Sequence, residues 1–306
     1  MSGVLRAGVD LGGSKTEIAV LDAAGRELLR EREATPAGDY EGTLRTIAAL
    51  VAAAETRLGR GASVGVCTPG AISPATGLLK NSNSVCLNGR PLLTDLARTL
   101  RRPVRIANDA DCLALSEATD GAARGAAGVF GVIIGTGTGG GVVINGRLLA
   151  GPNAIAGEWG HNPLPWPRDE ERPGPPCYCG KHGCIETWLS GPGLARDYRR
   201  ATGLDLDAGG IAAREVQGEP AAVACLSRYV DRMARALASV INVLDPDVIV
   251  LGGGVGNIER LYRDVPQLWR RYVFSDRVDT RLLRPLHGDS SGVRGAACLW
   301  PADGPD

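Results

Sequence analysis

The sequence predicts an α/β protein with a duplicated core. Apolar segments with the length of buried strands alternate with segments of helical periodicity along the 306 residues. Two of these strands, residues 4–10 and 129–134, each lead into a turn rich in glycine and hydroxyl groups and then into a second apolar strand. Because the backbone N–H groups of such turns suit phosphates, we expect each half to present a phosphate-binding turn to a shared cleft.

The bulk composition argues against several classes of protein. Lys plus Arg and Asp plus Glu both number 34, so there is no basic excess of the kind that nucleic-acid binding requires. No signal peptide is visible, and no apolar run is long enough to cross a bilayer. Five cysteines (67, 86, 112, 225 and 298) are scattered, as buried reduced thiols would be. We therefore expect a cytoplasmic protein that binds neither nucleic acid nor a membrane.

The first turn is expected to be a hairpin. Residues 17–21 and 28–35 have the pattern of two further strands, so Gly12 and Gly13 lie between strands. A P-loop or a dinucleotide-binding loop would instead open a helix, and its glycine pattern is absent here. In one interpretation the turn approaches a phosphate while Asp10 holds a hydrated cation. The alternative is an ordinary glycine hairpin.

Two loops of the N-terminal half carry polar groups. After a helix predicted at residues 39–58, a short strand ends in Thr68-Pro69-Gly70, the kind of strand-end turn that lines a cleft. Residues 80–84 and 88–89 then place many amide and hydroxyl groups in one loop. Amides suit the adjacent hydroxyls of a sugar, since they both donate and accept hydrogen bonds. A solvated polar loop is the alternative.

A pair of acidic residues follows the strand predicted at residues 104–107. Asn108, Asp109 and Asp111 stand at its carboxyl end, where open α/β sheets place their chemistry, and a helix follows. Either aspartate would also suit a helix cap. The adjacency of the two carboxylates leaves open which of them is functional.

The second half repeats this design and adds a third glycine segment. Residues 135–141 are predicted to form the turn, and residues 142–144 the return strand. Beyond a long helix at 220–244 and a strand at 248–251, residues 252–256 open another helix, and glycines there let a flat base lie against the backbone. Two phosphate-type turns together favour a nucleotide site.

Three cysteines within eight residues predict a metal site. Cys177, Cys179 and Cys184 follow the spacing C-x-C-x4-C, with glycines at the turns. Three thiolates and one imidazole favour a closed, structural zinc site over free or disulfide-bonded cysteines. His161 and His182 compete as the fourth ligand, and we favour His161 because His182 would strain the short loop. The charged, proline-rich residues 168–176 before the cysteines are expected to be an exposed loop.

These motifs together resemble the ROK family of sugar kinases, which has the two-lobed fold of actin and hexokinase with its duplicated ribonuclease H-like core. The resemblance covers nearly the whole chain. It implies a small α/β lobe at residues 1–118, completed by the C-terminal helix at 288–306, and a large lobe at 119–287 that carries the zinc loop 161–186. The motifs that carry the resemblance are Asp10–Lys15, Thr68–Gly70, Asn108-Asp109, Gly135–Gly139, Glu158–His161, Cys177–Glu186 and Leu251–Gly254.

The resemblance also implies roles for individual residues. Asp109 would be the general base, and the zinc ligands would be His161, Cys177, Cys179 and Cys184. The residues expected to bind the sugar are Asn83, Asn108, Asp109, Glu158, His161 and Glu186. The residues expected to bind ATP are Asp10, Gly12, Gly13, Ser14, Lys15, Thr16, Gly135, Thr136, Gly137, Thr138, Gly253 and Gly254. Asp10 is also the expected magnesium ligand.

Within the family, residues 80–90 and 161–166 look most like the bacterial fructokinase (mannokinase-type) branch. We therefore expect a homodimeric, zinc-containing kinase that uses ATP and Mg²⁺ to phosphorylate the 6-hydroxyl of D-fructose. The alternatives are a glucokinase, a mannokinase, an N-acetylhexosamine kinase, or a non-catalytic sugar-sensing regulator. A repressor would carry a DNA-binding domain first, whereas the first turn here begins by residue 10. One departure is Cys86, where the branch often has Trp, and this departure alters a wall of the expected sugar site.

Overall fold

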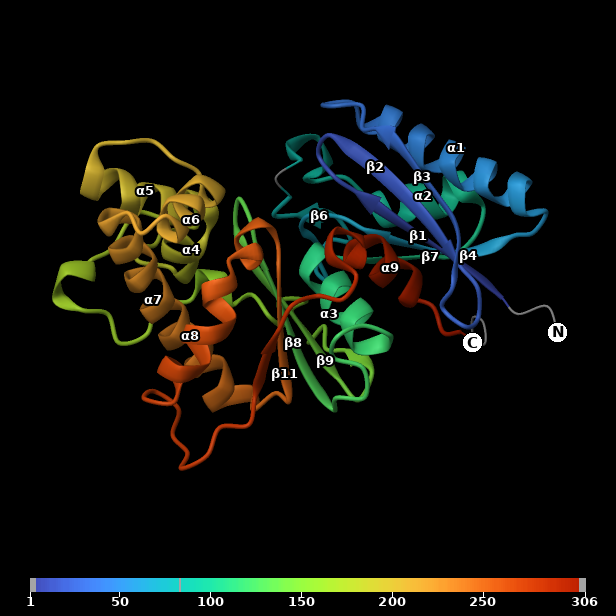
Figure 1. Cartoon of the computed structure of the whole chain (residues 1–306). Coiled ribbons are helices and arrows are strands. Elements are labelled where there is room, and N and C mark those ends of the chain that lie inside the picture. Colours follow the sequence, from blue (N-terminus) through green and yellow to red (C-terminus); the bar gives the residue numbers. More distant parts are fainter. Residues whose placement is uncertain (1–3, 83, 303–306) are drawn as a thin grey trace. The chain divides into compact units, whose positions relative to one another are not determined.

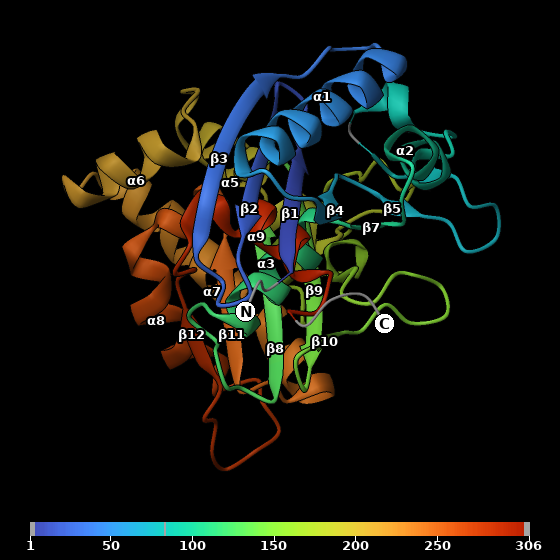
Figure 2. The same ribbon diagram turned by 90° about the vertical axis from the view of Figure 1, so that its right-hand side faces the viewer.

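The computed structural model describes residues 4–82 and 84–302, and Figures 1 and 2 follow the chain by colour. The chain forms two compact units. Unit 1 takes its described residues from 1–124, 146–156 and 286–306, and unit 2 consists of 125–145 and 157–285. None of the helices in the described ranges combines the length and the apolar character that crossing a bilayer requires.

Unit 1 is built on a five-stranded mixed sheet in the order β3-β2-β1-β4-β7. Its strands are β1 (Leu5–Leu11), β2 (Lys15–Leu21), β3 (Glu27–Ala34), β4 (Ala62–Cys67) and β7 (Val104–Ala107). The first three strands are antiparallel, and β4 and β7 run parallel to β1. The carboxyl ends of β1, β4 and β7 therefore meet at one edge, where Asp10 pairs with Cys67 and Cys67 with Ala107.

Helices cover this sheet, and the last of them packs on it most closely. The remaining elements of unit 1 are α1 (Tyr40–Leu58), β5 (Ala71–Ile72), β6 (Leu79–Lys80), η1 (Val85–Leu87), α2 (Leu92–Leu100), α3 (Asp109–Thr119), β10 (Arg147–Leu148), η5 (Gly288–Ser290) and α9 (Ser291–Cys298). A side chain at Gly8 or Gly65 would collide with the backbone carbonyls of Val293 and Ala296. Glycines in β1 and β4 thus let the backbone of α9 lie directly on the sheet, beside α3 (Figure 1).

Unit 2 repeats the arrangement of a hairpin followed by parallel strands. The strands of this unit's sheet lie in the order β9-β8-β11-β12, in which β9 is antiparallel and β11 parallel to β8. The strands are β8 (Gly128–Ile134), β9 (Thr138–Ile144), β11 (Val248–Gly252) and β12 (Arg281–Leu283). In unit 1, β1 has the same relation to β2 and β4. The duplicated core predicted from the two glycine turns is therefore present.

The second turn is shorter than the sequence predicts. Strand β9 already begins at Thr138, so only residues 135–137 form the turn and the following glycines belong to the strand. The reason is packing at Gly140, where a side chain would meet the ring of Phe130 and Trp159 Cδ1 at 2.8 and 2.9 Å. Glycine is needed here because Trp159 lies against the strand.

The helices of unit 2 pack around one long helix. Helix α7 (Pro220–Leu244) has the bounds that the sequence predicts, and Met233 and Leu237 on it are fully buried. Its neighbours are α5, α6, α8 and α4. These and the remaining elements are η2 (Trp159–His161), η3 (Asp169–Glu171), α4 (Ile185–Leu189), α5 (Gly191–Thr202), α6 (Ala208–Val216), η4 (Gly254–Asn257) and α8 (Glu259–Trp269).

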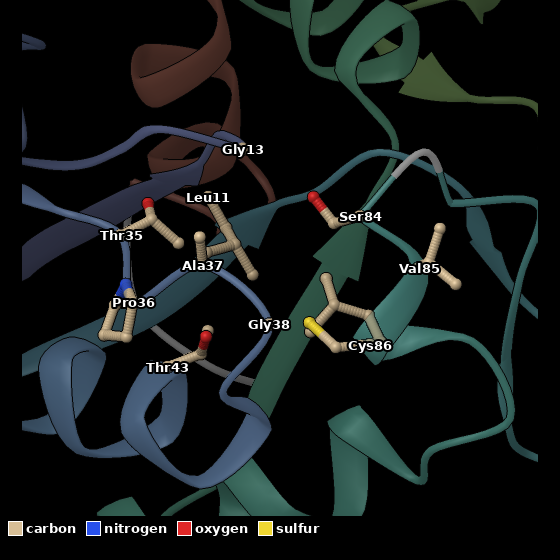
Figure 3. Close-up of a pocket in the computed structure, with 11 residues that line it drawn as sticks. Leu11, Gly13, Thr35, Pro36, Ala37, Gly38, Thr43, Ser84, Val85 and Cys86 are labelled. Carbon is tan, nitrogen blue, oxygen red and sulfur yellow. The ribbon is translucent and has the colours of Figure 1, made fainter.

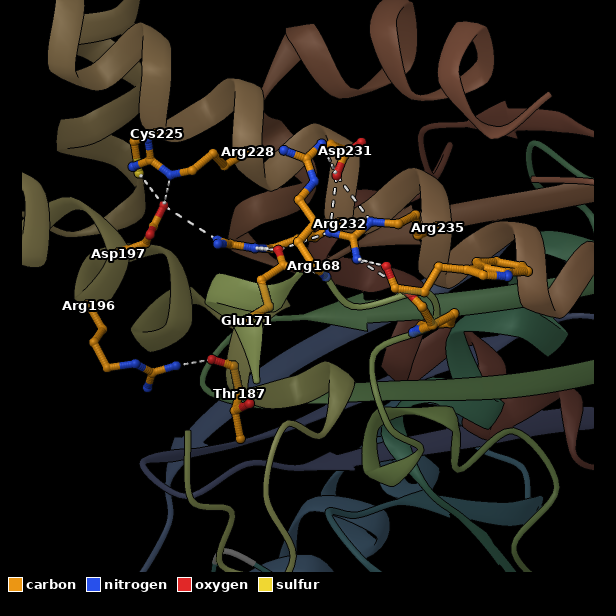
Figure 4. A network of polar contacts seen from close by, with 12 residues as sticks. Arg168, Glu171, Thr187, Arg196, Asp197, Cys225, Arg228, Asp231, Arg232 and Arg235 are labelled. Atoms are coloured by element: carbon orange, nitrogen blue, oxygen red, sulfur yellow. Dashed lines mark hydrogen bonds and ion pairs between the residues drawn. The ribbon is translucent and has the colours of Figure 1, made fainter. Parts of the chain in front are cut away.

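The segment 168–176 is mostly exposed, as predicted, but it contains one buried carboxylate. Glu171 is 5% exposed and accepts hydrogen bonds from Arg232 Nε at 2.8 Å and Arg235 Nη2 at 2.9 Å (Figure 4). Both arginines belong to α7. The same carboxylate also accepts the backbone N–H of Arg168 at 2.9 Å. These bonds fasten the segment that precedes the three cysteines to the core of unit 2.

We expect Glu171→Gln to lower the free energy of unfolding by about 2 kcal/mol at neutral pH, because it takes one of two carboxylate partners from each of two buried arginines. Arg232 keeps Asp197 at 3.4 Å, and Arg235 keeps Asp231 at 3.0 Å. Burial acts to raise the pKa of Glu171, but the hydrogen bonds from Arg235, the Arg168 N–H and Arg232 outweigh it and lower the pKa to about 2. The folded state therefore prefers the ionised form. Its stabilising effect is complete above the ordinary pKa of 4.5 and is lost as the pH falls from there towards 2.

Urea denaturation of both proteins at pH 7 and pH 3 measures this effect, and the difference between them should shrink at pH 3. Asp169→Asn is the matched control, because that side chain is fully exposed two residues away. An equal loss in the Glu171 and Asp169 variants would contradict the role given to the buried network.

Candidate functional site

Two carboxylates lie close together at the carboxyl edge of the unit 1 sheet. Asp10 ends β1 next to Cys67 of β4, and Asp109 follows β7. Burial raises the pKa of Asp10 to about 6. A hydrogen bond from the Cys67 thiol opposes this rise, and the neighbouring charge of Asp109 adds to it. The edge therefore concentrates negative charge where a cation or a proton can be held.

Asn108, and neither aspartate, provides the side-chain cap of α3. Its Oδ1 accepts the backbone N–H of Asp111 at 2.6 Å. Asp109 is the first residue of the helix, and its Oδ1 accepts the N–H of Ala110 at 2.9 Å. Part of the Asp109 side chain is open to solvent, yet loss of hydration around the carboxyl raises its pKa above the ordinary value. Asp109 thus carries a poorly hydrated carboxylate that is held at a helix N-terminus.

Threonine hydroxyls support the first glycine turn. Gly12 donates its N–H to the Lys15 carbonyl at 3.0 Å, and Thr35 Oγ1 donates to the Gly12 carbonyl at 2.9 Å. Thr16 is buried, and its hydroxyl lies 2.8 Å from that of Thr35. Gly13, Ser14 and Lys15 are exposed. The turn therefore presents backbone N–H groups, a hydroxyl and an ammonium group to solvent, and the hydrogen bonds beneath it hold it in place.

Three glycine segments of unit 2 meet at the carboxyl end of β8. Gly135 closes the second turn through its N–H to the Gly137 carbonyl at 3.0 Å, and its own carbonyl accepts the N–H of Gly191 at 2.8 Å. Gly253 packs so tightly on Ile134 that a side chain there would collide with the Ile134 carbonyl. Sequence reasoning missed the segment at Gly191. Ser190, whose hydroxyl caps Gly193, and the following proline were the available signals of a helix start.

Glu186 connects the cysteine loop to the second turn. Its Oε2 accepts the backbone N–H of Thr138 at 3.0 Å. A side chain at Gly137 would lie 2.7 Å from the same oxygen and would push the carboxylate out of this position. The carboxylate that follows the cysteines is therefore held against the backbone of the turn.

The segment from Glu158 to His161 is fixed on strand β9. A side chain at Gly160 would collide with the Thr138 carbonyl. Trp159 Nε1 donates to the Gly139 carbonyl at 3.0 Å, and the Trp159 ring packs edge-on against Phe130 with centroids 5.7 Å apart. These contacts set where the imidazole of His161 can lie.

Four donor atoms converge beside this segment. The ligand atoms of His161, Cys177, Cys179 and Cys184 all lie within 4.8 Å of one another, and His182 is outside this cluster of described residues. His161 Nδ1 lies 3.5 Å from Cys177 Sγ, and Cys179 Sγ lies 3.6 Å from Cys184 Sγ. Tetrahedral zinc with Zn–S distances of about 2.3 Å and a Zn–N distance of about 2.1 Å has edges of about 3.6–3.8 Å. The donor set and its spacing fit such an ion.

Tyr178 holds the other nitrogen of the same imidazole. Its hydroxyl lies 2.8 Å from His161 Nε2, and the two rings meet edge to face with centroids 5.0 Å apart. Loss of hydration and the nearby negative charges of Glu186, Cys177 and Glu158 raise the pKa of Tyr178 to about 12. Sequence reasoning missed Tyr178, because nothing in a residue between two cysteines signals a contact with His161.

The predicted site residues therefore fall into two groups. Asp10, residues 12–16, Asn108 and Asp109 belong to unit 1, and Glu158, His161, Glu186, residues 135–138 and residues 253–254 belong to unit 2. Within each unit the structure brings the group to one edge of the sheet. Asn83, the remaining predicted sugar ligand, lies outside the described residues.

The chain belongs to the ROK family, whose sequence model matches residues 6–303. It is 39% identical over 300 residues to the N-acetyl-D-glucosamine kinase of Yersinia pseudotuberculosis, an alignment that covers 97% of this chain and 99% of the relative. The match extends over both units, so the relative and this chain share their whole length.

Two solved structures share the fold. The ROK hexokinase of Thermus thermophilus superposes with a TM-score of 0.86 at 32% identity and covers 96% of this chain and 97% of its own. A ROK glucokinase of Streptomyces griseus, solved with glucose and AMPPNP, gives a TM-score of 0.77 at 29% identity, with 96% and 98% covered. The hexokinase-like fold is confirmed, and the protein is an ATP-dependent sugar kinase.

Proposed function

We propose that this protein phosphorylates the 6-hydroxyl of an N-acetylhexosamine, with N-acetyl-D-glucosamine as the preferred sugar. The observation that carries the proposal is the full-length similarity to an N-acetyl-D-glucosamine kinase. It favours the N-acetylhexosamine alternative over D-fructose, the sugar expected from the fructokinase-like segments of the sequence. The expected fructokinase branch is therefore not retained.

Asp109 is the general base of the proposed reaction. Its carboxylate takes the proton of the sugar's primary hydroxyl while that oxygen attacks the γ-phosphorus in line. The new bond joins the sugar oxygen to phosphorus as the bond to the β,γ-bridging oxygen breaks, so ADP leaves. The hydrogen bond to the Ala110 N–H fixes the carboxylate, which suits a reaction that depends chiefly on positioning.

The two glycine turns supply the binding of ATP in this proposal. Residues 12–15 and 135–138 would contact the phosphates through those backbone N–H groups and hydroxyls that the turns do not use themselves. The backbone of Gly253 and Gly254 would lie along the nucleotide. Mg²⁺ bound with ATP would supply positive charge beside the transferred group. Asp10 would hold its water shell, a role supported by its carboxyl at the end of β1 near Asp109.

We assign the cluster of His161 and the three cysteines to a structural zinc ion. Its four protein ligands leave no open position for a reacting group. Through Nδ1 the ion would fix the ring of His161, and Nε2 on the far side of the ring is then oriented towards polar partners such as Tyr178. Asn108, Glu158, His161 and Glu186 are proposed to bind the sugar's hydroxyl groups, where an unmatched partner costs affinity.

A sugar panel tests the proposal. The panel compares kcat/KM for N-acetylglucosamine, N-acetylmannosamine, N-acetylgalactosamine, glucose, mannose and fructose with ATP and Mg²⁺. We expect N-acetylglucosamine to exceed glucose and fructose by at least ~10-fold, or about 1.4 kcal/mol of transition-state preference. If fructose or glucose leads instead, the proposed sugar is wrong, although the kinase activity stands.

A further inference from the structure

The side chain of Asp10 lies on the face of the unit 1 sheet that α9 covers. Successive side chains of a strand point to opposite faces, and Leu11, the next residue, lines the cavity of about 420 Å³ that Figure 3 shows. Gly8, two residues before Asp10, lies under the backbone of α9. The carboxyl of Asp10 therefore stands on the α9 side of the sheet, beside Cys67, its partner in β4.

One glycine of α9 lies against this carboxyl. Gly292 is the second residue of the helix. A β-carbon at this position would lie 2.9 Å from Asp10 Oδ2 and 3.3 Å from Asp10 Cγ, and Cys67 Sγ would follow at 3.6 Å. The two distances to Asp10 are shorter than van der Waals contact, so a side chain at Gly292 and the present position of the carboxyl exclude each other.

The other glycines around α9 serve packing, and Gly292 does not. At Gly8, Gly65 and Gly295 an added β-carbon would lie 1.9 Å from a backbone carbonyl oxygen, so these positions let two backbones approach each other. At Gly292 the three nearest atoms all belong to side chains. Gly292 is also partly accessible, whereas Gly295 is buried. The packing of α9 therefore does not explain why residue 292 is a glycine.

Hydrogen bonds fasten the start of α9, so the helix cannot easily retreat from Asp10. Ser291 Oγ donates to Glu117 Oε1 at 2.9 Å, and the side chain of Glu117 is fully buried. The same carboxylate accepts the backbone N–H groups of residues 286–287 at 2.9 and 3.2 Å. These bonds tie the segment before the helix to α3. A methyl group at position 292 would consequently displace the carboxyl of Asp10 and leave the helix in place.

We infer that Gly292 is a positioning residue of the kinase reaction, because its missing side chain leaves the space in which the carboxyl of Asp10 stands. The inference rests on the proposed function, in which Asp10 would hold the water shell of Mg²⁺. That shell has a nearly ideal octahedral geometry, so a carboxyl that accepts its hydrogen bonds must keep one orientation. Cys67 borders the carboxyl within the sheet, and the bare α-carbon of Gly292 borders it from the helix.

Gly292→Ala tests the inference through the effect of Mg²⁺ on nucleotide binding. Calorimetry measures the affinity for a non-hydrolysable ATP analogue with and without Mg²⁺, in the absence of sugar, so the readout does not depend on turnover. We expect the variant to lose at least ~5-fold of the gain in affinity that Mg²⁺ provides, as for the loss of about one hydrogen bond. Its affinity without Mg²⁺ should be unchanged. Its thermal midpoint should stay close to that of the wild type, since alanine is a better helix former than glycine and only a carboxyl has to turn.

Two further alanine variants separate positioning from packing. Gly209 lies exposed in α6, and a β-carbon there would have Asp207 Oδ1 at 3.7 Å as its neighbour, so Gly209→Ala should change neither quantity. Gly295→Ala should show the opposite pattern to Gly292→Ala. Its β-carbon would collide with the backbone carbonyl of Cys112, so the thermal midpoint should fall while the folded protein keeps the Mg²⁺-dependent gain.

Asp10→Asn distinguishes a failure of this inference from a failure of the proposed function. If Asp10→Asn loses the Mg²⁺-dependent gain and Gly292→Ala keeps it, Gly292 does not position the carboxyl. An equal loss in Gly292→Ala and Gly295→Ala also overturns the inference, since disturbed packing of α9 then explains both. If Asp10→Asn keeps the gain, the role of Asp10 in the proposed function is wrong as well.

Discussion

An enzyme with Asp109→Asn is expected to lose at least ~10²-fold in kcat and to keep its affinity for sugar and ATP, in the range usual for loss of a general base. The amide has the shape of the carboxylate, and its oxygen can still accept the Ala110 N–H. It cannot take the proton from the sugar hydroxyl. Steady-state kinetics with a direct binding measurement for both ligands would separate the loss of turnover from a loss of binding.

Asp111→Asn is the matched control for this prediction. The cap of α3 uses the backbone N–H of Asp111 and the side chain of Asn108, so the substitution keeps that bond. We expect its kcat to stay within ~5-fold of the wild type, small beside the loss of a base. A severe loss in Asp111→Asn with a mild one in Asp109→Asn would show that the roles of the two carboxylates are reversed.

Removal of zinc is expected to have the other large effect. Metal analysis should find about one zinc per chain, and exhaustive chelation should lower the thermal midpoint and reduce kcat by at least ~10-fold, because His161 then loses the ion that fixes its ring. Cys179→Ser should reproduce the loss, since Cys179 Sγ lies 3.6 Å from Cys184 Sγ within the cluster.

Cys298→Ser serves as the control for the zinc experiment. Cys298 lies in α9 of unit 1, outside the cluster of donor atoms, so its replacement should leave the zinc content unchanged. A metal-free protein with full activity and an unchanged thermal midpoint would contradict the structural role of the ion.

Features set by local pattern could be predicted from the sequence. Helix α7 has the expected bounds because its apolar period is regular and Pro220 stands at its first position. The convergence of His161 with the three cysteines followed from donor chemistry and spacing. The helix depends on residues that are close along the chain. The metal site depends on residue types with specific chemistry, although His161 and Cys184 are 23 residues apart.

Features set by distant contacts could not be predicted. The glycines after Thr138 look like a turn, yet Trp159, some twenty residues later, requires them to be strand. Glu171 lies in a charged, proline-rich segment, and its arginine partners come 61 and 64 residues later.

The packing of α9 on the first sheet bears on the order in which the protein folds during its synthesis. Strands β1 and β4 are made early, but the helix whose backbone covers Gly8 and Gly65 comes from residues 291–298. The residues of unit 2 end at 285, so all of them leave the ribosome before that helix exists. Domains usually mature from the N-terminus onwards as the chain emerges. In this chain one face of the first sheet therefore stays uncovered until the second unit has been translated.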